Sequence, residues 1–128
     1  MTLIASRVDS DIDTLTSQLQ QLIRVPSVSA KKQVTVTKCA ELVCEIMSDS
    51  GISSELLKLD DTLVKNSEQV TPIVYGEVRS KRYPNGKTIL FYNHYDVQPA
   101  EPIELWHDDP FSGKIDGNLI YGRGASDD

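Results

Sequence analysis

The sequence predicts an α/β fold: a layered domain with a mixed β-sheet and flanking helices. Two segments near the N-terminus carry apolar residues at helical spacing, and short apolar segments bounded by turn residues follow them. Helices and strands in this order are typical of a layered α/β domain. We expect the layering to be incomplete, because no later helical segment is present to cover both faces of the sheet.

Two amphipathic helices are expected first. The first carries one apolar stripe, with Asp9 and Ser10 available as caps and Val25-Pro26 ending the helix, because a residue before proline disfavours the helical region. The stripe consists of Ile12, Leu15, Leu19, Leu22 and Ile23. A second helix is expected over residues 34–50, and Gly51 is its expected left-handed cap.

Three extended segments and a hairpin are expected next. The segments span residues 52–59, 72–78 and 88–92, and polar loops separate them. The third is the expected central strand, since its consecutive apolar residues suit a strand that is covered on both faces. The hairpin is indicated by Asp116-Gly117, which lies between residues 114–115 and 119–121.

Composition and charge narrow the classes of function. A chain of 128 residues with 39% hydrophobic content suits one domain with one core. The formal charge of -6 argues against nucleic-acid and anionic-membrane partners, which need a clustered basic surface. No stretch approaches the roughly 20 apolar residues that span a bilayer, and the N-terminus has no long apolar segment, so we expect a cytoplasmic location.

Cys39 and Cys44 are the two cysteines of the chain. They lie five residues apart in an expected helix, which directs them to different faces and argues against a disulfide between them. We therefore interpret both as reduced, small hydrophobic residues.

His94 and Asp96 follow the expected central strand. Side chains alternate along an extended segment, so these two point to the same face. A carboxylate in that position can fix one imidazole nitrogen while the other binds a metal ion. The alternative is a hydrogen-bonded surface histidine. His107, the other histidine, is expected to be exposed and not to bind metal, while Trp106 is expected to anchor its loop.

Asp127 and Asp128 form a second polar stretch, which Gly122 and Gly124 precede. Adjacent carboxylates repel each other unless a cation or solvent compensates their charge. A metal site and a solvated turn or helix start both explain the pair. Arg123, between the glycines, is interpreted either as a partner for a substrate carboxylate or as a surface or hairpin contact.

Taken together, these stretches resemble the family of co-catalytic di-zinc hydrolases that includes aminoacylases, carboxypeptidases of the G type, acetylornithine deacetylase and carnosine dipeptidases. The resemblance rests on residues 93–100, 106–111 and 117–128, which occur in the expected order. It extends to residues 72–78 and 25–29 and so covers nearly the whole chain. Asn93 is a departure, because the family usually has glycine before the histidine.

The resemblance implies a role for each matching residue. His94 would be a ligand of one metal ion, Asp96 the carboxylate of the catalytic site that orients it, and Asp127 the carboxylate that bridges both metal ions. Asp128 would be the following acid and not a ligand. Two zinc ions are implied, with cobalt or manganese as alternatives. The remaining ligands, the general-base glutamate and a distant histidine are expected beyond residue 128.

The implied function is cleavage of the amide bond of dipeptides or short peptides by the intact parent protein, an expected homodimer. Residues 1–128 would form the N-terminal part of the catalytic domain. A related alternative is an N-acyl amino acid deacylase of the acetylornithine or succinyl-diaminopimelate type. A non-catalytic α/β binding module is the alternative from another class. The chain by itself is expected to be inactive, to bind zinc poorly, to have a trans or disordered Asp127-Asp128 peptide and to self-associate through an open sheet edge.

Overall fold

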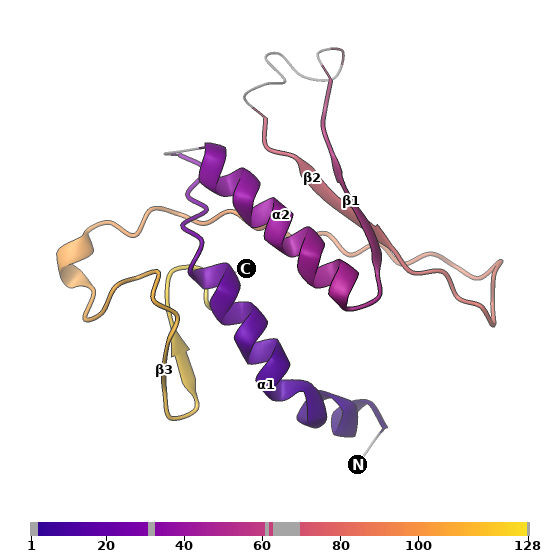
Figure 1. Ribbon diagram of the computed structural model, residues 1–128, viewed down its shortest axis with the longest axis horizontal. Helices are drawn as coiled ribbons and strands as arrows, with labels where there is room; N and C mark the ends of the chain where they lie inside the picture. The colour runs from indigo at the N-terminus through magenta and orange to yellow at the C-terminus, as the bar shows by residue number, and fades with distance from the viewer. Residues whose placement is uncertain (1–2, 31–32, 61, 63–69, 128) are drawn as a thin grey trace.

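The computed structural model describes residues 3–30, 33–60, 62 and 70–127 of the chain (Figure 1). Two helices, α1 (Leu3–Ile23) and α2 (Gln33–Asp49), come first. They are followed by strands β1 (Ser53–Leu57) and β2 (Ile73–Glu77), the short 3-10 helix η2 (Ile103–Leu105), and strands β3 (Lys114–Asp116) and β4 (Leu119–Tyr121). The β1-β2 pair covers one side of α2, whereas β3 lies toward α1 (Figure 1).

Helix α1 ends where the sequence predicts but begins earlier. Asp9 and Ser10 lie inside the helix, so their expected capping role is wrong. The residues before them form helix without that cap, and Arg7 pairs with Asp11 one turn later at 2.6 Å. Only the end of the apolar stripe is deeply buried: Ile23 is 4% exposed, whereas Ile12 is 53% exposed.

Helix α2 agrees with its expected range and carries much of the core. Val36, Cys39 and Ala40 are each at most 2% exposed. The helix ends with Gly51 at φ 80°, a left-handed conformation that glycine adopts without strain. The Gly51 N–H donates to the Ser48 carbonyl at 2.9 Å, which satisfies one of the last helical acceptors.

Two antiparallel strand pairs are present at expected positions. Strands β1 and β2 pair from Ser53 with Glu77 to Leu57 with Ile73. Strands β3 and β4 form the expected hairpin, with Gly117 at φ 58° in its turn. Among the described residues, the parallel component of the expected mixed sheet is represented by one isolated bridge, between Val28 and Val97.

Residues 88–92 do not form the expected central strand. They belong to no strand ladder of the described chain, and they run extended and exposed. Exposed fractions are 75% for Ile89 and 87% for Leu90, Phe91 and Tyr92. An apolar run indicates a strand suited to burial, but it does not supply the neighbouring strands that bury it. The expected self-association through an open edge stays a prediction.

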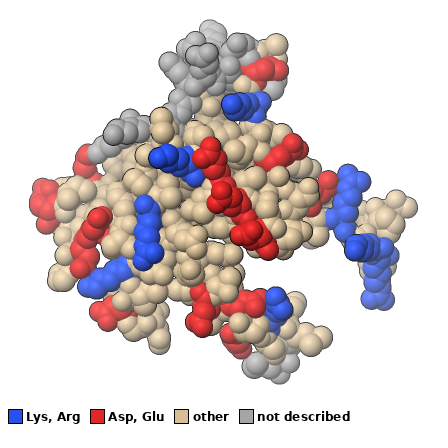
Figure 2. Space-filling view, viewed as in Figure 1, with Lys and Arg blue, Asp and Glu red and all other residues tan. Residues whose placement is uncertain are grey.

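Charged groups are unevenly placed on the surface. Acidic side chains form a row over α2, where Glu41, Glu45 and Asp49 line a shallow hollow, and basic side chains gather on the protruding loop of residues 79–87 (Figure 2). None of the helices in the described part of the chain combines the length and the apolar character needed to cross a membrane.

Candidate metal centre

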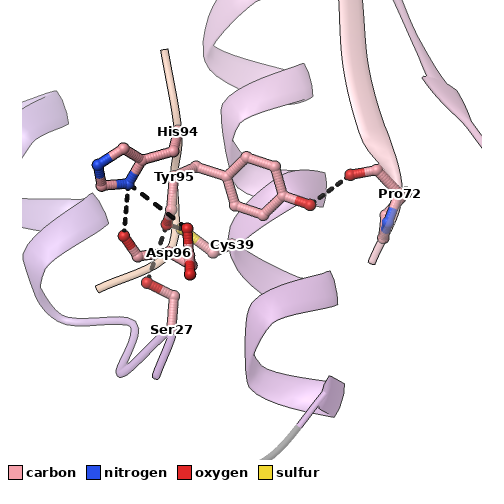
Figure 3. Close-up of polar contacts among 6 residues, drawn as sticks. All are labelled: Ser27, Cys39, Pro72, His94, Tyr95 and Asp96. Carbon is pink, nitrogen blue, oxygen red and sulfur yellow. Dashed lines mark hydrogen bonds and ion pairs between the residues drawn. The ribbon is translucent and has the colours of Figure 1, made fainter. Parts of the chain in front are cut away.

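The segment that carries His94 and Asp96 is held against the loop between the two helices. The Val97 N–H donates to the Ser27 carbonyl at 3.0 Å, and Val28 and Val97 form the parallel bridge. On the other side, the Tyr95 hydroxyl donates to the Pro72 carbonyl next to β2 (Figure 3). The backbone of the candidate site is therefore fixed between the loop after α1 and the start of β2.

His94 and Asp96 contact each other as the alternating pattern predicts. His94 Nδ1 lies 2.9 Å from the Asp96 backbone oxygen and 3.4 Å from its Oδ1 (Figure 3). Both of these oxygens are acceptors, so they place a proton on Nδ1, and the neutral form of the ring is then the Nδ1-protonated tautomer. That tautomer carries its lone pair on Nε2, the nitrogen on the side of the ring away from Asp96.

Asp127 joins these two residues around one hollow. The hollow has a volume of about 310 Å³ and is lined by His94, Asp96, Val97, Gln98, Arg123, Gly124 and Asp127. Imidazole nitrogen and carboxylate oxygen are donors that suit zinc, cobalt and manganese. The residues present therefore fit a borderline divalent cation in kind, although they are fewer than the three protein ligands of a typical catalytic zinc site.

The described residues contain no group of three histidine, cysteine or acidic side chains able to hold a metal ion. Asp128 and the expected trans or disordered peptide before it lie outside the described residues. The described part of the chain thus brings together two expected ligands, His94 and Asp127, and the orienting Asp96. It does not add a third ligand for a single ion.

Trp106 and Arg123 connect the two segments that line the hollow. The Trp106 indole donates from Nε1 to the Ala100 carbonyl at 2.7 Å, which confirms its expected anchoring role. The Arg123 guanidinium stacks 5.3 Å from the centre of the Trp106 ring, and its backbone N–H donates to the Pro110 carbonyl at 2.7 Å. Arg123 Nε is buried without a hydrogen-bond partner among the described residues. The sequence analysis did not predict the stacking of Arg123 on Trp106, because no local sequence pattern signals such a contact.

His107 lies apart from the hollow. It contacts Asp108 at 3.1 Å, and Lys114 Nζ approaches the same carboxylate at 2.8 Å. The hydrogen bond from Lys114, followed by the one from His107, lowers the pKa of Asp108 below its ordinary value. This cluster is a surface ion-pair group and lines no part of the candidate metal centre.

Ser27 and Cys39 also reach the candidate site, and sequence reasoning missed both. Each donates to the Tyr95 carbonyl, Ser27 Oγ at 2.9 Å and Cys39 Sγ at 3.3 Å. Cys39 is a free, buried thiol, as expected, but it is also a donor. Burial raises the pKa of Cys39, the Ser27 hydrogen bond opposes that rise, and the negative charge of Asp96 adds to it. Burial likewise raises the pKa of Tyr95.

Comparison with known proteins supports the interpretation of the segments that carry His94, Asp96 and Asp127. Residues 90–128 match the sequence profile described as Peptidase family M20/M25/M40. The Cys-Gly metallodipeptidase dug1 of Schizosaccharomyces pombe is 32% identical over 125 residues, which are 94% of this chain and 26% of that protein. The chain is a homologue of the M20 peptidases. The succinyl-diaminopimelate desuccinylase of Blochmanniella floridana is 33% identical over 118 residues, which are 92% of this chain and 27% of the desuccinylase.

Solved structures confirm the α/β fold of the M20 homologue. The dipeptidase Dug1p of Saccharomyces cerevisiae superposes with a TM-score of 0.81 at 29% identity, over 96% of this chain and 27% of that one. The M20 metallo-carboxypeptidase Sso-CP2 of Sulfolobus solfataricus gives 0.71 at 35% identity, over 85% and 22%. The chain thus spans about a quarter of the length of the relatives it matches.

Proposed function

We propose that residues 1–128 contribute the N-terminal part of the catalytic domain of a metal-dependent hydrolase that cleaves the amide bond of dipeptides or short peptides. The observation that carries the proposal is the shared hollow of His94, Asp96 and Asp127, which lies within the segment that matches the M20 peptidases. The intact protein would be the enzyme, because the described part of the chain lacks a third ligand.

Each residue of the hollow has a distinct role in this proposal. His94 would be a ligand of one metal ion, and Asp127 would be a carboxylate ligand shared by two ions. Bound divalent ions, zinc with cobalt or manganese as alternatives, would supply Lewis acidity toward the amide carbonyl and toward water. Asp96 would hold a proton of His94 on Nδ1, because its backbone oxygen and its Oδ1 both lie close to that nitrogen.

The proposed substrate is a small peptide or an N-acyl amino acid. Similarity to metallodipeptidases favours a dipeptide. A deacylase of the desuccinylase type is the second candidate, because a desuccinylase is similar over 92% of this chain. A homodimer, which the resemblance to the family implies, and a cytoplasmic location, which the sequence predicts, remain part of the proposal.

Metal removal tests the proposal in the full-length protein that carries this chain. Dialysis against a chelator is expected to abolish hydrolysis of a panel that contains Cys-Gly, other dipeptides and N-succinyl-diaminopimelate, and added zinc or cobalt is expected to restore it. The preferred member of the panel separates the dipeptidase from the deacylase. Full activity after verified metal removal would overturn the proposal.

A further inference from the structure

The carbonyl of Tyr95 lies in the backbone between His94 and Asp96 and accepts two side-chain hydrogen bonds. Ser27 Oγ donates from the loop after α1, and Cys39 Sγ donates from α2 (Figure 3). Both donors are only 2% exposed. A carbonyl that accepts from two buried donors is satisfied and has a fixed direction, since rotating the peptide would break both bonds and leave the buried donors without this partner.

These bonds fix the backbone on both sides of Asp96. The Tyr95 carbonyl belongs to the peptide unit that ends at the Asp96 nitrogen, so Ser27 Oγ and Cys39 Sγ orient that peptide plane. The Ser27 carbonyl in turn accepts from the Val97 N–H at 3.0 Å. Ser27 therefore binds the chain immediately before and immediately after Asp96, through its side chain and its backbone.

The side chains of the candidate metal centre are not fixed by their own burial. The side chain of His94 is 50% exposed and that of Asp96 is 39% exposed. Their mutual contact passes in part through a backbone atom, because His94 Nδ1 lies 2.9 Å from the Asp96 carbonyl oxygen. A change in the peptide planes around Asp96 would displace this oxygen and with it the imidazole ring.

We propose that Ser27 and Cys39 are positioning residues of the metal centre, which hold the Tyr95 carbonyl and thereby set the contact between His94 and Asp96. The inference rests on the proposed function, because it assigns His94 to a metal ion. Cys39 acts here as a neutral donor and not as a ligand: burial favours its protonated form, and it is absent from the hollow.

Substitutions that keep or remove the donor separate this role from simple core packing. Ser27→Ala and Cys39→Ala remove one donor each, whereas Cys39→Ser and Ser27→Cys keep a donor at nearly the same place. Hydrogen-bond partners of a metal-binding histidine typically contribute about 10- to 100-fold to metal affinity. Ser27 and Cys39 donate to the backbone beside such a partner and not to the histidine itself. We expect about a tenfold loss of metal affinity for each alanine variant and substantial recovery in the donor-retaining variants.

The chain provides a matched control pair away from the centre. Ser54 Oγ donates to the Cys44 carbonyl at 2.9 Å, and Cys44 Sγ approaches Ser54 Oγ at 3.3 Å. Ser54→Ala and Cys44→Ala therefore delete the same atoms and similar hydrogen bonds, but neither residue lines the hollow of His94, Asp96 and Asp127. Metal affinity is expected to stay at the wild-type value in both controls.

Two measurements on the full-length protein test the inference. Cobalt titration, read from the visible absorption of the bound ion, gives metal affinity and ligand geometry. NMR of the metal-free protein gives the Tyr95 carbonyl and Asp96 amide shifts, which respond directly to loss of the two hydrogen bonds. We expect Ser27→Ala and Cys39→Ala to change both readouts and Cys39→Ser to restore them. Thermal unfolding verifies that each compared variant is folded. If an alanine variant does not fold, the donor-retaining variants still decide the test.

The outcomes distinguish this inference from the proposed function. Wild-type cobalt affinity in His94→Ala would overturn both, because His94 would then bind no metal ion. A large loss in His94→Ala, together with Ser27 and Cys39 variants that behave like the Ser54 and Cys44 controls, would overturn the positioning role alone.

Discussion

Gly122 lies where the loop that leads to Asp127 passes over the buried end of α1. A Cβ atom built at Gly122 would lie 2.5 Å from Ile23 Cγ2 and 3.2 Å from the Pro110 carbonyl oxygen. Ile23 is 4% exposed and β-branched, so its side chain has little freedom to move away from the added atom. Gly122→Ala is therefore an overpacking substitution, which typically costs about 1 to 3 kcal/mol.

Urea unfolding of the protein that carries this chain measures the cost, with Gly76→Ala as the matched control. A Cβ at Gly76 would come still closer, 2.2 Å, to Met47 Cε, the end of a flexible side chain, and it would lie 3.0 Å from Ile52 Cγ2, farther than the 2.5 Å from Ile23 Cγ2 at Gly122. We expect Gly122→Ala to be the more destabilising of the two and also to weaken metal binding, because the displaced loop carries Asp127. If Gly122→Ala matched the wild type in both stability and metal affinity, the assigned packing of this loop would be refuted.

Four further outcomes are expected. In the full-length protein, Asp96→Asn should lower activity by about 10- to 100-fold and His94→Ala by more, as steady-state kinetics will show; a neutral Asp96→Asn would remove the orienting role. At pH 8, iodoacetamide should modify Cys44 before Cys39, which peptide mass analysis detects, because Cys39 is buried and burial raises its pKa. The raised pKa of Cys39 also predicts how stability depends on pH. The neutral thiol stabilises the fold fully below the pKa of an unfolded thiol, and this contribution is lost as pH rises through the folded pKa. Urea unfolding should therefore show a smaller loss of stability at alkaline pH for Cys39→Ala than for the wild type. The chain alone should bind zinc only weakly in calorimetric titration and hydrolyse no dipeptide, since about three protein ligands are usual for a catalytic zinc site; submicromolar affinity with turnover would contradict this.

Local sequence signals predicted the elements that local interactions determine. The end of α1 before Pro26, the left-handed Gly51 after α2 and the β3-β4 turn at Gly117 all follow from backbone preferences of single residues. The start of α1 was misplaced because helix propagates through suitable residues without the cap at Asp9 or Ser10. Strand formation by residues 88–92 depends on partners distant in the sequence, which an apolar run does not specify.

The same distinction holds at the candidate site. The contact between His94 and Asp96 follows from the two-residue period of an extended segment, and so it was predictable. The hydrogen bonds to the Tyr95 carbonyl join residues 68 and 56 positions apart. Such contacts arise from the packing of α2 and the loop after α1, and they leave no pattern in the sequence near His94.

The two bonds made by Ser27 also have a consequence for the order of folding. They close a loop of 68 residues between Ser27 and Tyr95, and the length-dependent entropy of such a closure is about 4 kcal/mol. Contacts of such long range are slow to form compared with helices and hairpins. The hydrogen bonds to the Tyr95 carbonyl are therefore expected to form only after α2 and the β1-β2 pair, so the backbone around Asp96 takes its final direction late in folding.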